Sequence, residues 1–588
     1  MLNDNRIGIA IIRNNASDKS LYWNYALKEL SNLVNSLIMV CLDNCNINRY
    51  QSISIPIEYV SLETDYTNVE VAEYILSSRK DLNQTLSEVL IFDDSFYGPL
   101  YDMTGIFQDM KNIEADYWGI SKRAQSIEDY FLVLKESVFR ISNFAKKFSQ
   151  FKGVSIAITD LYSDEPESVN YRLLITDEKI PLIKKSIFED SKEHLLKYNH
   201  ADEISYILKY ISDNYTYDIN CIIQDLLNKK NITDIVKVLN SLIIIDDNKH
   251  DIVDNLNTVI VIHLFYMDRL GYYRKYIQEI PKDIDIVFTT NTEEKKELIQ
   301  VAYKDITQSH NIQVRVVSSR GRDLAAFFVD CIDLMDQYEY IGFIHDKKSI
   351  RDGQSPSVGD TFSNILWDNI LYSSDYISNI IEYLKGNSKL GLMIPPTPYH
   401  GPYNAVSDNF WTRCLDKTKE LLARLNINID LDINIEPLSI GSAFWARTAI
   451  FRTVVENPFT HLDFPEEPMD VDGTIAHALE RVFPYLAQHE GYTTSYVMNP
   501  YYAAAEIFNF RELYYHSRRN ERNVSDLNNE LEVIVQEKLN ENEHMLIELK
   551  KIKYDYSSIL QSYNEVTNSI YWKLTAPIRF ILNKLKGK

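Results

Sequence analysis

The sequence predicts an α/β protein in which one strand–helix–strand pattern is used twice. Short apolar runs alternate with amphipathic helical stretches, which is typical of a parallel β-sheet covered by helices. Both halves contain an apolar run that ends abruptly in acidic residues. With 588 residues the chain is too long for one hydrophobic core, so we expect two or three domains.

The first half is expected to occupy residues 1–150. It opens with the apolar run 7–15, and a helical stretch and a second apolar run follow. A further helix leads to VLIFDDSFYGPL (89–100), where Asp93 and Asp94 end a predicted buried strand. Ligands of parallel sheets bind at the carboxyl ends of the strands, so these two carboxylates are candidates for a ligand site.

The second half is expected over residues 256–515, after a mostly helical connector at 151–255. It opens with TVIVIHLFYMD (258–268), which resembles the start of the first half in its pattern. A single helix is predicted over 320–340, and it leads into the strand IGFIHDKKS (341–349). This order repeats that of the first half and indicates an internal duplication.

The end of that strand presents four titratable side chains in a row: His345, Asp346, Lys347 and Lys348. A nucleoside diphosphate carries concentrated negative charge, which either a carboxylate-held divalent cation or basic side chains can neutralise. Asp346 is therefore a candidate metal ligand, and the two lysines are candidate phosphate partners. The alternative for these residues taken alone is a salt-bridged surface loop.

A second cluster lies at HLDFPEEPMDVDGTIAHALER (461–481), where Glu467, Asp470 and Asp472 crowd a proline-bounded loop. Clustered carboxylates repel one another, and this can raise the pKa of one of them. Such a carboxylate could act as general base and take a proton from a sugar hydroxyl. The alternative is a solvated acidic loop followed by a helix cap.

Two further groups are candidates for anion binding. His477 and Arg481 are four residues apart and are expected on one face of a helix. Arg320 and Arg322 flank a glycine, and Asp323 is expected to cap the helix that follows. Two schemes for neutralising a diphosphate stay open here: the lysines alone, or a magnesium or manganese ion between Asp346 and His477.

The C-terminal residues differ in composition from the rest. Residues 516–568 lack glycine and proline, and apolar residues from Met545 to Ile559 follow a 4,3,4,3 spacing, although the register before them drifts. This favours a long helix or a coiled coil that could form a homo-oligomer. Residues 569–588 are basic and amphipathic, which predicts contact with a membrane surface. The alternative is a docked terminal helix with a solvated basic face.

The bulk composition argues against some classes of protein. The net charge of −23 argues against a nucleic-acid-binding protein, because phosphate binding needs a basic surface. The five cysteines show no zinc-type spacing and are predicted to be reduced thiols of a cytoplasmic protein. The N-terminus lacks the features of a signal peptide, and no apolar stretch reaches the length of a spanning helix.

Several segments together resemble the rhamnan synthesis protein F family of bacterial polysaccharide glycosyltransferases, from about residue 5 to 495. The segments that carry the resemblance are VIHLFY, RGRDLAAF, YIGFIHDKKS, LMIPP, GSAFWAR, DGTIAHALER, DDSFYGPLY, DYWGI and IPLIKKSIF. The resemblance implies two tandem glycosyltransferase-A-like (Rossmann-type) domains. It also implies transfer of a sugar, rhamnose above all, from a nucleotide-diphosphate donor to a lipid-linked glycan at the inner face of the cell membrane.

The resemblance implies roles for the candidate residues. The donor would be held by Arg320, Arg322, Asp323, His345, Asp346, Lys347, Lys348, His477 and Arg481. The acceptor hydroxyl would be activated by Glu467, Asp470 or Asp472. The first half departs from the family pattern, because Asp93-Asp94-Ser95 stands where Asn-Asp-Ser is usual, and it is either a second transferase or a relic. Rivals are a non-catalytic glycan-binding scaffold and a methyltransferase, the latter disfavoured by the lack of a glycine-rich loop.

Overall fold

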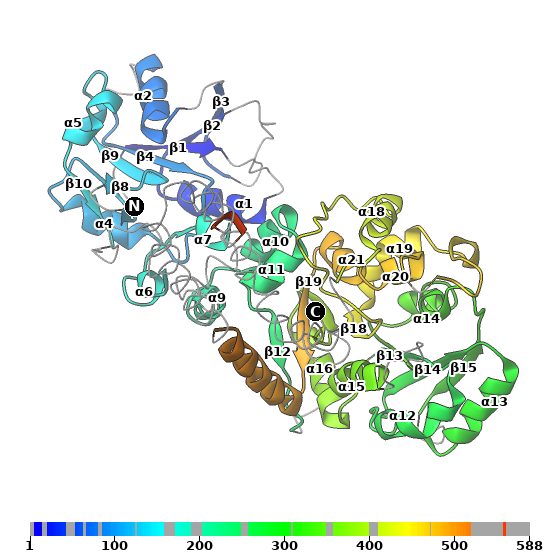
Figure 1. Ribbon diagram of the computed structural model, residues 1–588. Coiled ribbons are helices and arrows are strands. Elements are labelled where there is room, and N and C mark those ends of the chain that lie inside the picture. Colours follow the sequence, from blue (N-terminus) through cyan, green and yellow to red (C-terminus); the bar gives the residue numbers. More distant parts are fainter. Residues whose placement is uncertain are drawn as a thin grey trace, which may run out of the picture. The chain divides into compact units, whose positions relative to one another are not determined.

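The computed structural model divides the chain into two compact units, each described here by itself (Figure 1). Unit 1 comprises Met1–Lys230 and Lys237–Asn240, and unit 2 comprises Asn231–Val236 and Ser241–Lys588. The structure describes residues 5–13, 20–42, 53–62, 66–79, 85–123, 126–157, 171–189, 203–248, 257–306, 310–348, 357–398, 410–470, 472–518 and 557–559. The basic tail at 569–588 and nearly all of the predicted coiled coil lie outside the described residues.

Unit 1 is built on a mixed, mainly parallel sheet. Its described strands follow the order β10-β6-β9-β4-β1-β2-β3. Their bounds are β1 (Arg6–Ile12), β2 (Ser36–Leu42), β3 (Ile57–Leu62), β4 (Glu88–Asp93), β6 (Tyr117–Gly119), β9 (Phe131–Lys135) and β10 (Gly153–Ser155). Strand β9 runs antiparallel to both of its neighbours, whereas the other pairs are parallel.

Local sequence explains the elements around this sheet. Strand β1 is buried along its whole length, as expected of an apolar strand covered on both faces. Helix α2 (Asn68–Ser78) begins at a capping box: the Glu70 amide donates to Thr67 Oγ1, and the Thr67 amide donates to a Glu70 carboxylate oxygen. The other described helices of this unit are α1 (Leu21–Ser31), α4 (Thr104–Lys111), α5 (Glu136–Phe139), η1 (Ala145–Gln150), α6 (Tyr171–Thr176), α7 (Ser186–Glu189), α9 (Glu203–Asn214) and α10 (Asn220–Lys229).

Part of the predicted connector at 151–255 belongs to unit 1. Strand β11 (Ile183–Lys184) pairs antiparallel with β5 (Phe96–Tyr97), and helix α10 packs on α1. A small hairpin joins β7 (Lys122–Arg123) to β8 (Ser126–Ile127). Helix α11 (Ile232–Val238) contains residues of both units, and β12 (Leu242–Ile244) belongs to the sheet of unit 2. The segment is therefore shared between the two units.

Unit 2 contains a larger sheet with the same plan. Its described strands follow the order β12-β19-β17-β18-β16-β13-β14-β15. The bounds are β13 (Thr258–His263), β14 (Ile284–Thr290), β15 (Ile312–Val316), β16 (Tyr340–His345), β17 (Leu390–Ile394), β18 (Phe444–Arg447) and β19 (Thr493–Met498). Strand β18 is antiparallel to β16 and β17, as β9 is to β4 and β6. The shared order and directions match the predicted internal duplication.

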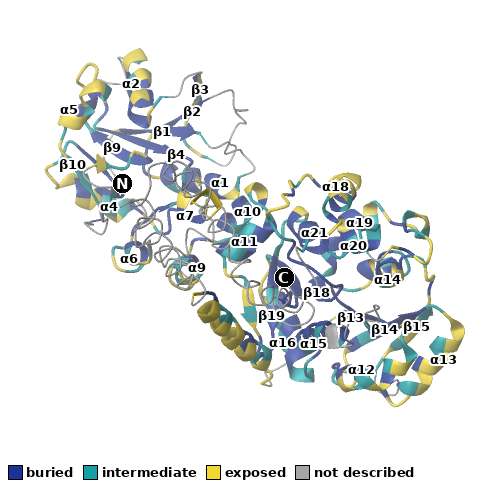
Figure 2. Ribbon diagram, in the orientation of Figure 1, coloured by how far each residue is buried: buried dark blue, intermediate teal, exposed yellow. Residues whose placement is uncertain are grey.

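Helices cover both faces of the unit 2 sheet, and Figure 2 shows its central strands as buried. On one face α12 and α15 bring Tyr273 and Trp367 together, with ring centroids 4.3 Å apart. On the other face Phe327 packs against Phe343, with ring centroids 4.6 Å apart. The described helices are η2 (Met267–Arg269), α12 (Leu270–Ile277), α13 (Glu293–Ala302), α14 (Arg322–Phe328), η4 (Ile332–Asp336), α15 (Ser357–Ile370), α16 (Ser374–Gly386), α18 (Leu415–Arg424), η5 (Thr448–Phe451), α19 (Arg452–Glu456), η6 (His461–Asp463), α20 (Ile475–Leu479), α21 (Phe483–His489) and a helix over 500–518.

The structure corrects two expectations. The single helix predicted over 320–340 is two shorter ones, α14 and η4, and between them the carbonyl of Asp330 accepts a 2.7 Å hydrogen bond from the Arg315 side chain. Cys41 is disulfide-bonded, so not all cysteines are reduced; Cys331 and Cys414 have free thiols. Metal-motif spacing does not test whether two thiols approach each other in the fold. Among the described residues, no helix is both long and apolar enough to cross a bilayer.

Candidate functional site

Asp346 lies at the carboxyl edge of the unit 2 sheet, directly after β16. Its backbone amide donates to the carbonyl of His263 (3.0 Å) at the end of the neighbouring strand β13. Its Oδ2 accepts hydrogen bonds from the backbone amides of Phe265 (2.8 Å) and Tyr266 (2.6 Å). Its Oδ1 is buried and has no hydrogen-bond partner among the described residues. One oxygen thus fixes the carboxylate, and the other is left for a ligand.

Burial sets the protonation of Asp346. The side chain is 4% exposed, and this burial raises its pKa to about 6, although the two backbone amides and His345 act in the opposite direction. A buried carboxylate oxygen with no partner, such as Oδ1 of Asp346, is costly, and a bound cation or hydrogen-bond donor would relieve that cost.

Other buried acceptors without partners lie along the same edge. Thr290 is the last residue of β14, Asn291 follows it, and Asp323 lies in the first turn of α14. Thr290 Oγ1, Asn291 Oδ1 and Asp323 Oδ2 each lack a hydrogen-bond partner among the described residues. Burial would raise the pKa of Asp323, but His345 and His263 more than offset it, and the pKa is lowered. Each buried unpaired group costs about 1–3 kcal/mol, so several at one edge indicate a place built for a ligand.

The two lysines after Asp346 have interactions inside the unit. The Lys347 amide donates to the Tyr273 hydroxyl (3.0 Å), and its Nζ lies 3.9 Å from the ring centroid of Phe362. Nζ of Lys348 donates to Asp268 Oδ2 (2.6 Å), which lowers the pKa of that carboxyl group. The sequence places both lysines beside Asp346, and a ligand would have to compete with Asp268 for Lys348.

Lys295 is a cation of the same edge that the sequence motifs do not indicate. It lies in α13, and its Nζ is 3.5 Å from the ring centroid of Phe265, whose amide holds Asp346. Burial lowers the pKa of Lys295, and the charge of Asp346 acts in the opposite direction. The available signal was its place just after the apolar strand 284–290, the position that parallel sheets use for ligands.

The arginines of the RGRD segment bind the acidic loop. Arg322 makes a two-pronged ion pair with Glu467, with Nε–Oε1 at 2.9 Å and Nη2–Oε2 at 3.3 Å. Nε of Arg320 donates to the carbonyl of Phe464 (2.7 Å). Gly321 between them has φ +83°, and a Cβ there would lie 2.5 Å from Cγ of Phe464. The glycine is therefore required for this close approach.

The carboxylates of the loop differ from the expectation of mutual repulsion. Burial would raise the pKa of Glu467, but the Arg322 guanidinium outweighs it, and the pKa is lowered. Asp472 accepts hydrogen bonds from the Arg413 amide (3.1 Å) and the Cys414 thiol (3.2 Å), and its pKa is also lowered despite burial. The prediction of a repulsion-raised pKa is wrong for both residues, because each carboxylate has donors. Asp470 is exposed and makes no hydrogen bond or ion pair with another described residue.

His477 and Arg481 share helix-face contacts close to this loop. Nδ1 of His477 lies 2.8 Å from Thr474 Oγ1, and burial lowers the pKa of the imidazole. Arg481 is 4% exposed, and its guanidinium donates to the carbonyls of Phe410 and His477. Arg481 thus holds two backbone segments together. Within the described ranges no three or more His, Cys, Asp or Glu side chains form a metal-binding cluster.

The equivalent edge of unit 1 is internally bonded. Oδ1 of Asp94 accepts from the Arg13 amide (2.9 Å) after β1, which parallels the contact of Asp346 with the chain after β13. Both oxygens of Asp93 have partners: the Ser95 amide at 3.0 Å and the Asn68 side chain at 2.7 Å. Both aspartates are buried. The sequence prediction that these carboxylates lie at a strand end therefore holds, but their acceptor atoms are engaged within the unit.

A buried lysine lies near these aspartates. Lys185, from the IPLIKKSIF segment, has its amide bonded to the Ser95 carbonyl (2.8 Å) and its Nζ 3.3 Å from Asp225 Oδ2. The ammonium also lies 3.5 Å from the ring centroid of Tyr22. Burial lowers its pKa to about 8, while the charge of Asp225 acts in the opposite direction. The ion-pair partner of Lys185 is thus Asp225, and the charge of Asp94 acts on its ammonium group in the same direction.

The chain is similar to several known proteins. It is 24% identical over 240 residues to the uncharacterized protein WxcX from two strains of Xanthomonas campestris pv. campestris, which is 40% of this chain and 32% of the relative. The chain thus spans about a third of the length of these curated relatives. Among solved structures, the glycosyltransferase GlyE of Streptococcus pneumoniae TIGR4 aligns with 59% of this chain and 87% of its own, at 10% identity and a TM-score of 0.21. S. aureus TarS, residues 1–349, aligns with 41% of this chain and 57% of its own, at 11% identity and a TM-score of 0.22.

A family model also matches the chain. The model of rhamnan synthesis protein F covers residues 78–162 and 157–492 of this chain. That range includes Asp93 and Asp94 of unit 1 and the whole Asp346 edge of unit 2. The chain therefore belongs to the rhamnan synthesis protein F family.

Proposed function

We propose that the protein is a glycosyltransferase of polysaccharide synthesis and that unit 2 carries the transfer site. The observation that supports this most is the carboxylate of Asp346, held by two backbone amides through one oxygen and unpartnered among the described residues at the other. The donor would be a nucleoside diphosphate sugar, and rhamnose is the sugar that the family name suggests. The acceptor would be a growing glycan on a lipid carrier.

The diphosphate would lie at the carboxyl edge beside Asp346. Oδ1 of Asp346 fits a divalent cation such as Mg²⁺ or Mn²⁺, since such ions are commonly held by one or two carboxylates together with substrate phosphates. The cation would neutralise charge on the leaving group. Lys295, Lys347 and Lys348 lie close enough in sequence or space to share that task. His477 would donate a hydrogen bond to a phosphate group and would not be a metal ligand, because its Nδ1 is hydrogen-bonded to Thr474 and no described contact joins it to Asp346.

The general base would be Asp470. Glu467 and Asp472 are held by donors that lower their pKa values, which weakens them as bases. Asp470 lies in the same loop and is exposed, so it is accessible to an acceptor hydroxyl. In this proposal Arg322 positions the loop through Glu467 and does not bind the nucleotide directly.

The decisive experiment uses the purified full chain with a panel of nucleoside diphosphate sugars and a membrane extract as the source of acceptor. Release of nucleoside diphosphate that depends on the extract supports a transferase. Glycan binding without any release would support the non-catalytic scaffold instead. EDTA separates the two neutralisation schemes: complete loss restored by Mn²⁺ supports the cation at Asp346, and retained activity supports lysines alone.

The proposed location is the inner face of the cell membrane. The basis is the basic amphipathic stretch 569–588, which lies outside the described residues. A homo-oligomer through 516–568 is likewise proposed from the sequence of that segment alone. Removal of residues 570–588 should shift the protein from the membrane pellet to the supernatant, with turnover of a soluble acceptor retained. A truncated protein that still pellets with membranes would contradict this location.

A further inference from the structure

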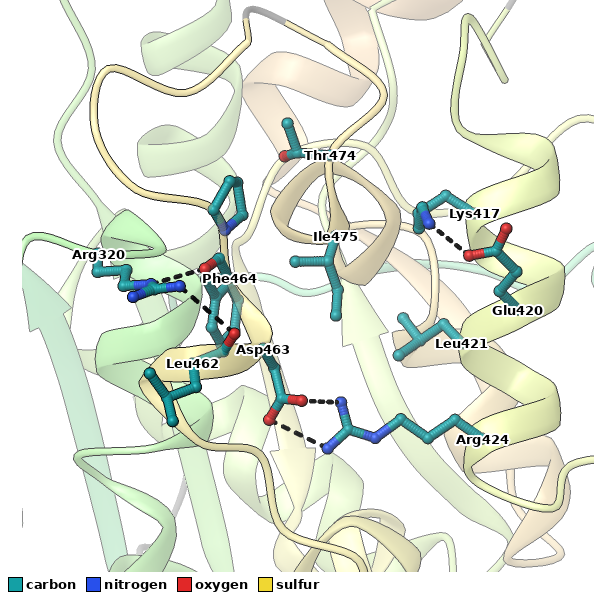
Figure 3. A pocket seen from close by; sticks show the side chains of 11 residues that line it. Arg320, Lys417, Glu420, Leu421, Arg424, Leu462, Asp463, Phe464, Thr474 and Ile475 are labelled. Carbon is teal, nitrogen blue, oxygen red and sulfur yellow. Dashed lines mark hydrogen bonds and ion pairs between the residues drawn. The ribbon is translucent and has the colours of Figure 1, made fainter.

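A cavity of about 620 Å³ lies in unit 2 beside the acidic loop (Figure 3). Its size falls within the range of about 300–1,000 Å³ that is usual for small-molecule sites. One wall is helix α18, a second is the segment Leu462–Pro465, and a third is the start of α20 at Thr474 and Ile475. Arg320 closes a further side and joins the cavity to the RGRD segment.

The charges of this cavity are balanced. Arg424 makes a two-pronged ion pair with Asp463, with Nη1–Oδ1 at 2.8 Å and Nη2–Oδ2 at 3.1 Å. Lys417 pairs with Glu420 on the same helix, and Figure 3 shows both pairs facing the cavity. The third cation is Arg320, whose Nη1 lies 3.6 Å from Oε1 of Glu466 and whose Nε donates to the carbonyl of Phe464. Because every cation has a carboxylate partner, the cavity has no surplus positive charge for a phosphate group.

The remaining lining suits a neutral, amphipathic ring. Ile475 and the exposed Leu462 supply apolar surface to the cavity, and the buried Leu421 and Phe464 lie behind it. A pyranose ring has an apolar C–H face and an edge of hydroxyl groups, each both donor and acceptor. The guanidinium of Arg424 and the carboxylate of Asp463 would offer such hydroxyls both kinds of partner, and ionised partners make the stronger hydrogen bonds.

The cavity is joined to the proposed base by the chain itself. Pro465 and Thr474 belong to two of its walls, and the segment between them carries Glu467 and Asp470. The same loop is tied to the donor edge by the Arg322–Glu467 ion pair. A sugar bound in the cavity would therefore be held next to the loop that carries the proposed base.

We propose that this cavity is the acceptor subsite and that it binds a neutral hexose residue of the growing glycan. The proposal rests on the glycosyltransferase function proposed above. It assigns Arg424 and Asp463 to the sugar hydroxyls and Leu462 and Ile475 to the C–H face. Nucleotide binding stays at the Asp346 edge, outside this cavity.

The test compares two variants with a matched control. Asp463→Asn removes one of the two carboxylates that line the cavity, the partner of Arg424, and Ile475→Trp fills the cavity without replacing a member of an ion pair. The control is Asp333→Asn, because Asp333 accepts the same two-pronged contact from Arg315 (2.6 and 2.9 Å) but does not line the cavity. Thermal unfolding of the full chain checks folding, which matters for Asp463 because it also caps η6 through Thr460.

Binding is measured by saturation-transfer NMR with methyl α-L-rhamnopyranoside and a rhamnose-containing trisaccharide, and the KM for the trisaccharide acceptor is measured with a saturating donor. We expect at least a tenfold rise in acceptor KM and loss of the sugar signal in both cavity variants, with donor Kd within twofold and the control unchanged. A folded Ile475→Trp variant with wild-type acceptor KM would overturn the subsite. If the wild-type chain turns over no donor at all, the proposed function fails instead, so the two failures are distinct.

Discussion

The backbone amide of Tyr266 donates a 2.6 Å hydrogen bond to Oδ2 of Asp346, which joins the ends of β13 and β16. This contact orients the carboxylate so that its other oxygen is a buried acceptor with no described partner. In unit 1 the Arg13 amide makes the corresponding contact with Asp94, but there the neighbouring Asp93 is satisfied by the unit itself. The two related halves thus differ in the acceptors that they leave for a ligand.

Replacement of Asp346 by asparagine should abolish most of the transfer. Asn keeps one oxygen to accept from the Phe265 and Tyr266 amides, so the fold should be preserved, but the negative charge is lost. We expect kcat to fall by about 10²–10³, as is typical when one electrostatic group of a site is removed. Thermal unfolding serves as the control for folding. A folded variant with wild-type kcat would place the transfer site elsewhere.

Donor binding should weaken as the pH falls below about 6. Burial raises the pKa of Asp346 to about 6, so the carboxyl group is charged above that pH and neutral below it. If the charged form holds the cation, affinity for a nucleoside diphosphate with Mn²⁺ should drop by about tenfold per pH unit below 6. Titration calorimetry from pH 5 to 8 measures this, and the Asp346→Asn variant should show no such step. A midpoint near the ordinary aspartate value would contradict the assignment.

Among the acidic residues of the loop, Asp470 should matter most to the chemical step. Removal of a general base typically costs about 10²–10⁴ in rate, so Asp470→Asn should lower kcat by at least about 10². Glu467→Gln is the matched comparison, because it loses mainly its ion pair with Arg322, which is partly exposed. Single-turnover kinetics with saturating donor would show the difference. The reverse order of effects would assign the base to Glu467.

Gly321→Ala should destabilise unit 2. The residue has φ +83°, a conformation that costs an alanine about 1–2 kcal/mol. The new Cβ would also lie 2.5 Å from Cγ of Phe464, so the loop that carries Phe464 must move. Gly271→Ala is the control, because a Cβ there meets nothing within 4 Å and the residue lies within α12. Equal melting temperatures for the two variants would show that the close approach does not contribute.

Asp94→Asn should leave transfer within twofold of wild type and lower thermal stability. Asp94 is fully buried and its Oδ1 accepts from the Arg13 amide, a contact that asparagine can retain only in part of its orientations. The measurement compares the reaction products of this variant with those of the Asp346→Asn variant. Loss of a second, different product would show that unit 1 is itself a transferase, and loss of the same product would indicate one composite activity.

The sequence by itself determined the α/β class, the repeated order of elements and the placement of Asp346 and Asp94 at strand ends. Period-two and helical patterns depend on neighbouring residues, and the end of a parallel strand is a ligand position whatever the rest of the fold does. The family resemblance from HDKK, RGRD and DGTIAHALER also needed only local motifs. The pairing of Arg322 with Glu467 could not be predicted in this way, because 145 residues separate the two side chains.

Tertiary structure decided which of the candidate groups have partners. The spacing of the loop carboxylates predicts repulsion, but Arg322 lowers the pKa of Glu467, and hydrogen bonds from Thr412 and Cys414 lower that of Asp472. Packing of segments that are distant in sequence brings Lys295 to Phe265, and it likewise brings Arg424 to Asp463. Charge and hydrogen-bond energies depend on distance and burial, which the order of residues does not contain.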